Sequence, residues 1–202
     1  MGTFDCVVLS GGGAKGAYSA GVCKALFEYR RLKGIDTQLC FIGTSAGALN
    51  ACIIAALGED KLLEFWRNKV NNQTILGVRI TNAKSQFALK IVVRPLSAAF
   101  GKPFAIYPSA TSCLRKLINQ VVPETPDAKN GAAKESLFTK LADKHVIFTA
   151  TNYTTGRLHS FYNSSLFDKF VKEDAKLPIE KQRLSHCKII GDQKQLTDCL
   201  LA

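Results

Sequence analysis

The chain has 202 residues, of which 47% are hydrophobic, so it can bury one substantial core and is not a disordered chain. Its 27 lysines and arginines outnumber its 16 aspartates and glutamates, giving a formal net charge of +11. Such a charge favours anionic partners, such as phospholipid headgroups or nucleic acid, although solubility alone would explain it equally well.

The sequence also bears on the protein's location and on metal binding. It contains no run of about 18 apolar residues, so we expect no membrane-spanning helix. Asp5 lies early and no basic segment precedes the first apolar run, so we expect no secretory signal. No C-x-x-C pair occurs, which argues against a zinc site. We interpret Cys6, Cys40 and Cys52 as small buried hydrophobic residues in a reduced protein. We expect that protein to be cytoplasmic, with a peripheral association with membranes as the extension of this expectation.

The first sixty residues alternate between strand and helix signals. Residues 4–9 (FDCVVL) and 38–42 (QLCFI) predict buried strands. Residues 15–33 predict a helix that ends before Gly34, and residues 46–57 predict a second, small-residue helix. The apolar face expected for the first helix consists of Val22, Ala25, Leu26, Tyr29 and Leu32. This alternation predicts a parallel sheet with helices on its faces and chemistry at the carboxyl ends of the strands.

The rest of the chain is less regular. Residues 146–153 and 157–162 flank Thr155 and Gly156 and predict a β-hairpin, and residues 123–133 predict a polar loop. Further helices are predicted at residues 61–70, 109–122, 164–176 and 193–202. We find no internal repeat and treat residues 1–202 as a single domain.

A G-x-S-x-G motif, Gly43-Thr44-Ser45-Ala46-Gly47, stands between the second strand and the helix that follows it. That context is the one in which a strained turn exposes a nucleophilic serine. The helix N-terminus would also favour developing negative charge nearby. The alternative is an ordinary serine N-cap in a small-residue turn.

A glycine-rich stretch, "LSGGGAKGAY" at residues 9–18, follows the first strand. A P-loop does not fit, because Lys15 is followed by Gly16 rather than by Ser or Thr. Gly11, Gly13 and Gly16 match a dinucleotide loop, but the candidate acid, Asp36, precedes the second strand instead of following it. An oxyanion hole is the interpretation that uses both turns, since successive glycine amides can converge on an ester oxygen as it gains charge.

With both motifs in place, the chain resembles the patatin-like phospholipases, which pair G-G-G-x-[RK]-G with G-x-S-x-G in this order. The resemblance is firm over residues 4–60 and diffuse beyond them. It implies a three-layer α/β/α sandwich with a mainly parallel central sheet. It also implies serine-dependent hydrolysis of phospholipid or other acyl-ester lipids, without a metal or another cofactor.

The resemblance identifies the site residues one by one. Ser45 matches the nucleophile. The remaining site residues are the oxyanion donors Gly11, Gly12, Gly13 and Ala46, the elbow glycines Gly43 and Gly47, and the loop-supporting Lys15 and Gly16. Lys15 would either brace the loop or simply solvate the helix start.

The general base is missing from the pattern. The family takes a catalytic Asp from a late D-G-[GA] turn, and this sequence contains no Asp-Gly dipeptide. Asp192 follows a glycine and Asp198 lies in a predicted helix, so the catalytic Asp is assigned to neither. The simplest interpretation is that residues 1–202 form the N-terminal and central part of a patatin-like catalytic domain, C-terminally incomplete. The chain would then be a fragment, a truncated product or an inactive relative.

Other readings stay open. His145, His159 and His186 all follow Ser45, as a Ser–acid–His order requires, but each is interpreted as structural or at the surface. A non-catalytic relative that binds lipid or a protein partner is the main alternative, and a nucleotide-binding module is a weaker one. No nucleic-acid partner is expected, because no reading element is recognisable.

Residues 65–123 contain no acidic residue. Their basic residues are Arg67, Lys69, Arg79, Lys84, Lys90, Arg94, Lys102, Arg115 and Lys116. Together with interspersed apolar residues they could dock on an anionic membrane surface or admit acyl chains. The alternative is core packing with solvated lysines.

Overall fold

The computed structural model describes residues 4–71, 74, 115–118, 136–151, 155–163 and 165–201. Within these ranges one sheet has the strand order β1-β2-β3-β4-β5. The strands are β1 (Phe4–Leu9), β2 (Gln38–Thr44), β3 (His145–Thr151), β4 (Leu158–Asn163) and β5 (Cys187–Ile189). β1, β2 and β3 are parallel, β4 is antiparallel to β3, and β5 is parallel to β4. The sheet is therefore mainly parallel, as expected.

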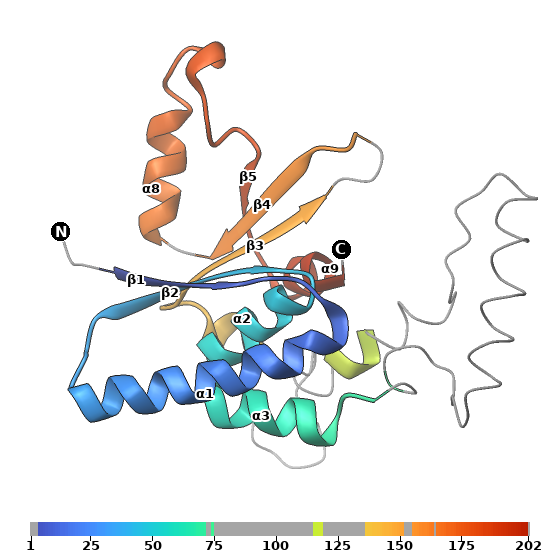
Figure 1. The fold of residues 1–202 in the computed structure, drawn as a ribbon. Helices are drawn as coiled ribbons and strands as arrows, with labels where there is room; N and C mark the ends of the chain where they lie inside the picture. Colours follow the sequence, from blue (N-terminus) through green and yellow to red (C-terminus); the bar gives the residue numbers. More distant parts are fainter. Residues whose placement is uncertain are drawn as a thin grey trace, which may run out of the picture.

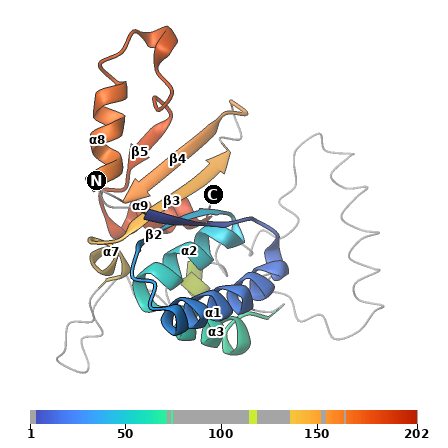
Figure 2. The ribbon, with the colours of Figure 1, turned by 60° about the vertical axis from the view of Figure 1, so that its left-hand side comes forward.

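Helices cover the sheet. They are α1 (Gly16–Lys33), α2 (Ala46–Leu57), α3 (Glu59–Asn68), α7 (Leu137–Lys140), α8 (Ser165–Asp174) and α9 (Gln193–Leu201), with short 3-10 turns at Gly13–Lys15 and Ile179–Lys181. Figures 1 and 2 show α1, α2 and α3 together on one side of β1 and β2, whereas α8 lies away from them, beyond β3 and β4. No helix in the described ranges is long and apolar enough to cross a membrane.

Helix α2 is the centre of the core. Every residue from Gly47 to Ala55 is buried, and the sequence of α2, AGALNACIIAAL, is apolar on all sides apart from Asn50. A helix that is apolar all round must be enclosed by other elements. α2 is enclosed by the sheet on one side and by α1 and α3 on the other. The helix that begins directly after Ser45 is therefore the most deeply buried one in the described structure.

The expected apolar face of α1 is wrong. Val22 is 49% exposed, Tyr29 53% and Leu32 84%. The buried residues of α1 are Gly16, Ala20 and Cys23. This small-residue face lets α1 approach α2 and α3 closely, and that close packing outweighs the burial of the larger side chains on the other face.

The remaining strand and helix predictions agree with the structure, with a few differences. β2 runs two residues past its expected end, to Thr44. β3 and β4 form the predicted hairpin, in which Thr149 pairs with Ser160. Within the predicted helix at 109–122, residues 115–118 are helical and Leu117 and Ile118 are buried. The predicted loop at 123–133 lies outside the described residues.

Two features depart from expectation. β5 was not predicted, because its three residues become a strand only through pairing with β4. Cys52 is fully buried as expected, but Cys6 is exposed and Cys40 only half-buried. These two cysteines lie in register on the sheet face opposite the one that packs on α2, which the described helices leave open at β1.

Candidate active site

Ser45 stands in a strained turn. It is exposed and has φ 55° and ψ −125°, the single non-glycine residue with positive φ in the described part of the chain. A side chain in this region of backbone space costs on the order of 1–3 kcal/mol, and such strain collects at functional sites. Because the turn follows β2 immediately and opens α2, the hydroxyl is presented at the carboxyl end of the strand.

The two elbow glycines are required by space. A Cβ on Gly43 would lie 2.6 Å from the Cα and the amide nitrogen of Ala48. A Cβ on Gly47 would lie 2.6 Å from the carbonyl carbon of Leu9 and 2.7 Å from the carbonyl oxygen of Ser10. All these neighbours are backbone atoms, so they cannot turn aside. The first turn of α2 is thereby pressed against the end of β1.

The glycine loop lies directly beside the turn that contains Ser45. A Cβ on Gly11 would be 3.1 Å from the Cβ of Ser45 and 3.2 Å from the carbonyl oxygen of Thr44. The register of the parallel strands explains this proximity, since Leu9 pairs with Gly43. The structure thus brings together the two motifs that the sequence places on separate turns.

The loop itself is open to solvent. Residues Gly11 to Lys15 are exposed, and among the described residues nothing beyond its chain neighbours lies within 4 Å of the position of a Cβ on Gly13. Gly13 has φ 57°, which glycine adopts without strain. The Lys15 amide donates to the Gly12 carbonyl at 3.2 Å and closes the turn. Lys15 therefore closes the loop through its backbone, while its Cβ packs 3.3 Å from the position of a Cβ on Gly12.

The N-terminus of α2 adds further donors. The amides of Ala48 and Leu49 donate to the Ser45 carbonyl at 2.9 and 3.2 Å. The amides of Ala46 and Gly47 come earlier and have no acceptor inside the helix. They lie at the positive end of the helix dipole, where negative charge is favoured. β2 is fixed here by a hydrogen bond between the hydroxyls of Thr44 and Thr149.

The late aspartates are engaged elsewhere. An oxygen of Asp192 accepts from the amide of Gln195 at 2.7 Å and caps α9. An oxygen of Asp198 accepts from Arg115 Nη2 at 2.7 Å. Within the described ranges, no carboxylate or imidazole is hydrogen-bonded to Ser45 Oγ.

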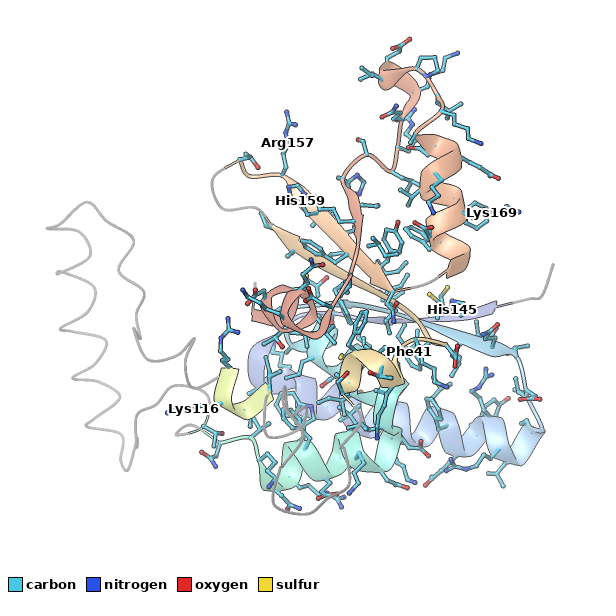
Figure 3. The ribbon with its side chains drawn as sticks, turned by 180° about the vertical axis from the view of Figure 1, so that it is seen from behind. Phe41, Lys116, His145, Arg157, His159 and Lys169 are labelled. Carbon is cyan, nitrogen blue, oxygen red and sulfur yellow. The ribbon has the colours of Figure 1, made fainter. Side chains whose placement is uncertain are left out.

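The histidines do not meet at Ser45. His145 opens β3, at the amino-terminal edge of the sheet, and burial lowers its pKa. His159 pairs with Ala150 near the other end of β3, and its Nδ1 is buried with no partner in the described structure. Figure 3 shows these two histidines well apart. His186 precedes β5, where its carbonyl accepts from the Ser160 amide at 3.2 Å.

A cavity of about 500 Å³ lies at the opposite edge of the sheet from Ser45. Its lining includes Arg30, Thr37, Phe41 and His145. Arg30 already donates to Asp5 at 2.5 Å and to the Thr37 carbonyl at 2.6 Å. None of the residues that line this cavity belongs to the glycine loop or to the G-x-S-x-G turn, so the cavity is separate from the candidate site. In the described part of the chain, no group of three or more His, Cys, Asp or Glu side chains is placed to hold a metal ion.

One residue near the site was missed by sequence reasoning. Asn50 is fully buried, donates from Nδ2 to the Gly16 carbonyl at 2.9 Å and accepts from Trp66 Nε1 at 2.7 Å. The sequence carried a signal, because Asn50 is an amide in an otherwise apolar helix. Buried amides of this kind need partners, and the partners lie on α1 and α3.

Comparisons with known proteins decide the family. The model of the patatin-like phospholipases matches residues 7–179. This chain belongs to the patatin-like phospholipase family. That membership supports the patatin-like fold. The matched range contains both motifs, the glycine loop at Gly11–Gly16 and the elbow at Gly43–Gly47.

A solved structure is also similar, that of VipD from Legionella pneumophila. It is 18% identical in sequence with a TM-score of 0.42, over 80% of this chain and 39% of the VipD chain. The patatin-like chain thus spans well under half the length of that structure. A comparison with curated proteins finds no match.

Proposed function

We propose that this patatin-like chain is a serine-dependent lipid acyl hydrolase in which Ser45 is the nucleophile. The observation that carries the proposal is the strained, exposed backbone of Ser45, with the glycine loop packed against it at Gly11. An ordinary N-cap serine needs neither the positive φ nor the second glycine loop. Both features are explained if an ester carbonyl is attacked between the loop and the helix N-terminus.

The reaction follows the usual order for covalent ester hydrolysis. Ser45 Oγ attacks the carbonyl carbon and gives up its proton, and the carbonyl oxygen becomes an oxyanion. The amides of Gly11, Gly12, Gly13 and Ala46 are the proposed donors to that oxyanion. The alcohol portion of the lipid leaves with a proton, and water then cleaves the acyl-serine ester to release a fatty acid and restore Ser45. Removing one oxyanion donor typically costs about 2.7–4 kcal/mol of transition-state stabilisation.

The deprotonation step needs a general base, and none is bonded to Ser45 Oγ in the described ranges. This observation favours the second candidate, a non-catalytic relative that binds lipid or a partner. The two candidates differ in the reactivity of Ser45. Without a base the hydroxyl keeps ordinary alcohol reactivity, although an oxyanion hole alone can retain roughly 10³–10⁴-fold catalysis over water in other serine enzymes.

A fluorophosphonate probe separates the candidates. The wild-type chain, Ser45→Ala and the matched control Ser185→Ala are incubated with the probe, and labelling is read by intact mass. Ser185 is exposed in the turn before β5. Labelling of the wild type and of Ser185→Ala, but not of Ser45→Ala, supports the hydrolase. A folded wild-type chain that stays unlabelled contradicts hydrolase activity of residues 1–202. The encoding gene is then sequenced past Ala202: a D-G-[GA] sequence downstream favours the N-terminal part of a lipase, and a stop codon favours the non-catalytic relative.

We further propose that the protein binds an anionic membrane surface to reach its lipid substrate. The support is the net charge of +11 and the acid-free span at 65–123. Most of this span lies outside the described residues, but Lys116 is exposed next to the buried Leu117 (Figure 3). Binding to phosphatidylglycerol-containing vesicles should exceed binding to phosphatidylcholine vesicles and weaken with salt. Equal binding to both vesicle types at all salt concentrations would contradict this docking.

A further inference from the structure

We propose that Asn50 is a positioning residue that holds the glycine loop at a fixed place relative to Ser45. The proposal rests on the proposed function, since it gives the loop the role of oxyanion hole. It adds a residue that belongs to neither motif. Asn50 lies on α2, the helix that begins directly after Ser45, and its carboxamide reaches the last glycine of the loop.

The hydrogen bonds of Asn50 fix how its carboxamide is turned. The indole Nε1 of Trp66 can only donate, so it must meet the carboxamide oxygen, as it does at 2.7 Å. The nitrogen end is then directed to the Gly16 carbonyl at 2.9 Å. With 0% exposure, Asn50 has no water to replace either partner. Losing one bond would leave a buried polar group unsatisfied, which is costly.

Trp66 presses the same point from the side of α3. Its ring atoms Cη2 and Cε2 lie 2.8 and 3.3 Å from where a Cβ of Gly16 would be. The indole therefore packs directly on the backbone of Gly16 while its nitrogen is held by Asn50. Three helices, α1, α2 and α3, thus meet at one carboxamide, at the position where the glycine loop becomes α1.

The loop is consequently held to α2 at both of its ends. Its entry is held where Gly47 packs on Leu9 and where Gly11 packs on Ser45. Its exit is held by the hydrogen bond from Asn50 to Gly16. Between these anchors the loop is exposed. An exposed loop keeps its geometry through its anchors, and a misplacement of about 1 Å can cost on the order of 10²-fold in rate.

The test compares Asn50→Leu, Trp66→Phe and the control Ile53→Ala. Leucine resembles asparagine in size but makes neither hydrogen bond. Phenylalanine removes the N–H donor and the outer indole atoms that pack on Gly16, but it leaves the hydrogen bond from Asn50 to Gly16. Ile53 is fully buried on the same helix and has no part in the loop contacts described above, so its truncation lowers stability without removing an anchor. Unfolding free energies are measured for all variants, and rates are expressed per folded molecule.

The first readout is hydrogen exchange of residues 10–20, which needs no activity. In Asn50→Leu, the amides of this segment should exchange about tenfold faster than in the wild type. In Trp66→Phe the increase should be smaller, because the hydrogen bond from Asn50 to Gly16 is kept. In Ile53→Ala, the amide exchange rate of residues 10–20 should rise no more than the measured loss of global stability accounts for. Exchange in Asn50→Leu equal to that of the wild type or matched by Ile53→Ala would overturn the proposal.

The second readout is the rate of fluorophosphonate labelling of Ser45. Asn50→Leu should lower the limiting inactivation rate by about 10- to 100-fold with little change in probe affinity. Ile53→Ala should label at the wild-type rate per folded molecule. Labelling of Asn50→Leu at the wild-type rate would also overturn the proposal. If the wild-type chain is not labelled at all, the proposed hydrolase fails, and the exchange readout alone decides whether Asn50 positions the loop.

Discussion

The indole of Trp66 occupies the space that any side chain on Gly16 would need. Its Cη2 lies 2.8 Å from the position of a Gly16 Cβ, and its Nε1 donates to Asn50. The need for glycine at position 16 therefore comes from packing against α3, a helix that begins more than forty residues later in the chain. Because the two residues are in contact, substitutions at Gly16 and Trp66 should change the free energy of unfolding non-additively.

Gly16→Ala should destabilise the protein by about 1–3 kcal/mol, because the new methyl group must displace a packed ring. Trp66→Leu should also destabilise it, through lost packing and the unpaired oxygen of Asn50. The double variant should lose less than the sum of the two, since leucine leaves room for the methyl group. Urea unfolding of the four proteins measures this coupling, and strict additivity would contradict the contact.

Gly47→Ala should abolish folding or cost more than about 3 kcal/mol, because its Cβ would meet the backbone of Leu9 and Ser10. Gly21→Ala is the matched control. Gly21 is exposed within α1, and no described residue outside its own helix turn lies within 4 Å of its Cβ position, so alanine should stabilise the protein by about 0.5–1 kcal/mol. Thermal unfolding compares both variants with the wild type. A well-folded Gly47→Ala protein would show that the elbow is not tightly packed on β1.

Ser45→Gly should be more stable than Ser45→Ala by about 1 kcal/mol. Both variants lack the serine hydroxyl, but only glycine relieves the positive φ of 55° at this position. Equal stabilities in urea would indicate that the turn carries no strain. The expected difference would measure the stability that the chain gives up to present a serine.

Tyr162 makes stability depend on pH in the alkaline range. Burial, followed by the hydrogen bond to Asp168, raises its pKa from 10.0 to about 12. Above pH 10 the unfolded chain loses this proton while the folded chain keeps it, so folding stability declines between about pH 10 and 12. Tyr162→Phe should lose less stability than the wild type between these pH values. Parallel pH profiles of the two unfolding midpoints would argue against the shift.

Local sequence signals were enough to predict the two glycine motifs and the elements that flank them. The strand at residues 4–9, the helix at 46–57 and both glycine motifs could be predicted, because each is encoded in a contiguous run. The positive φ of Ser45 follows from the same G-x-S-x-G context. Family membership also follows from the order of the two motifs, and the match over residues 7–179 agrees with it.

Other features depended on partners far along the chain. The buried face of α1 was mispredicted, because periodicity marks Leu32 as apolar but cannot tell that α2 and α3 accept the small face at Ala20 instead. β5 is too short to carry a strand pattern and exists through pairing with β4. The contact of Asn50 with Gly16 and Trp66 joins three helices that no local pattern relates.

The sequence by itself therefore determined the two motifs of the candidate site: a glycine loop after one strand and a serine turn after the next, each specified by short-range backbone chemistry. The tertiary structure alone decided how these parts are held together. Gly11 reaches Ser45 because β1 and β2 pair in register, and Gly16 is anchored because α3 brings Trp66 against it. Short-range preferences specify a turn, but the distance between two turns depends on packing between elements that are remote in the sequence.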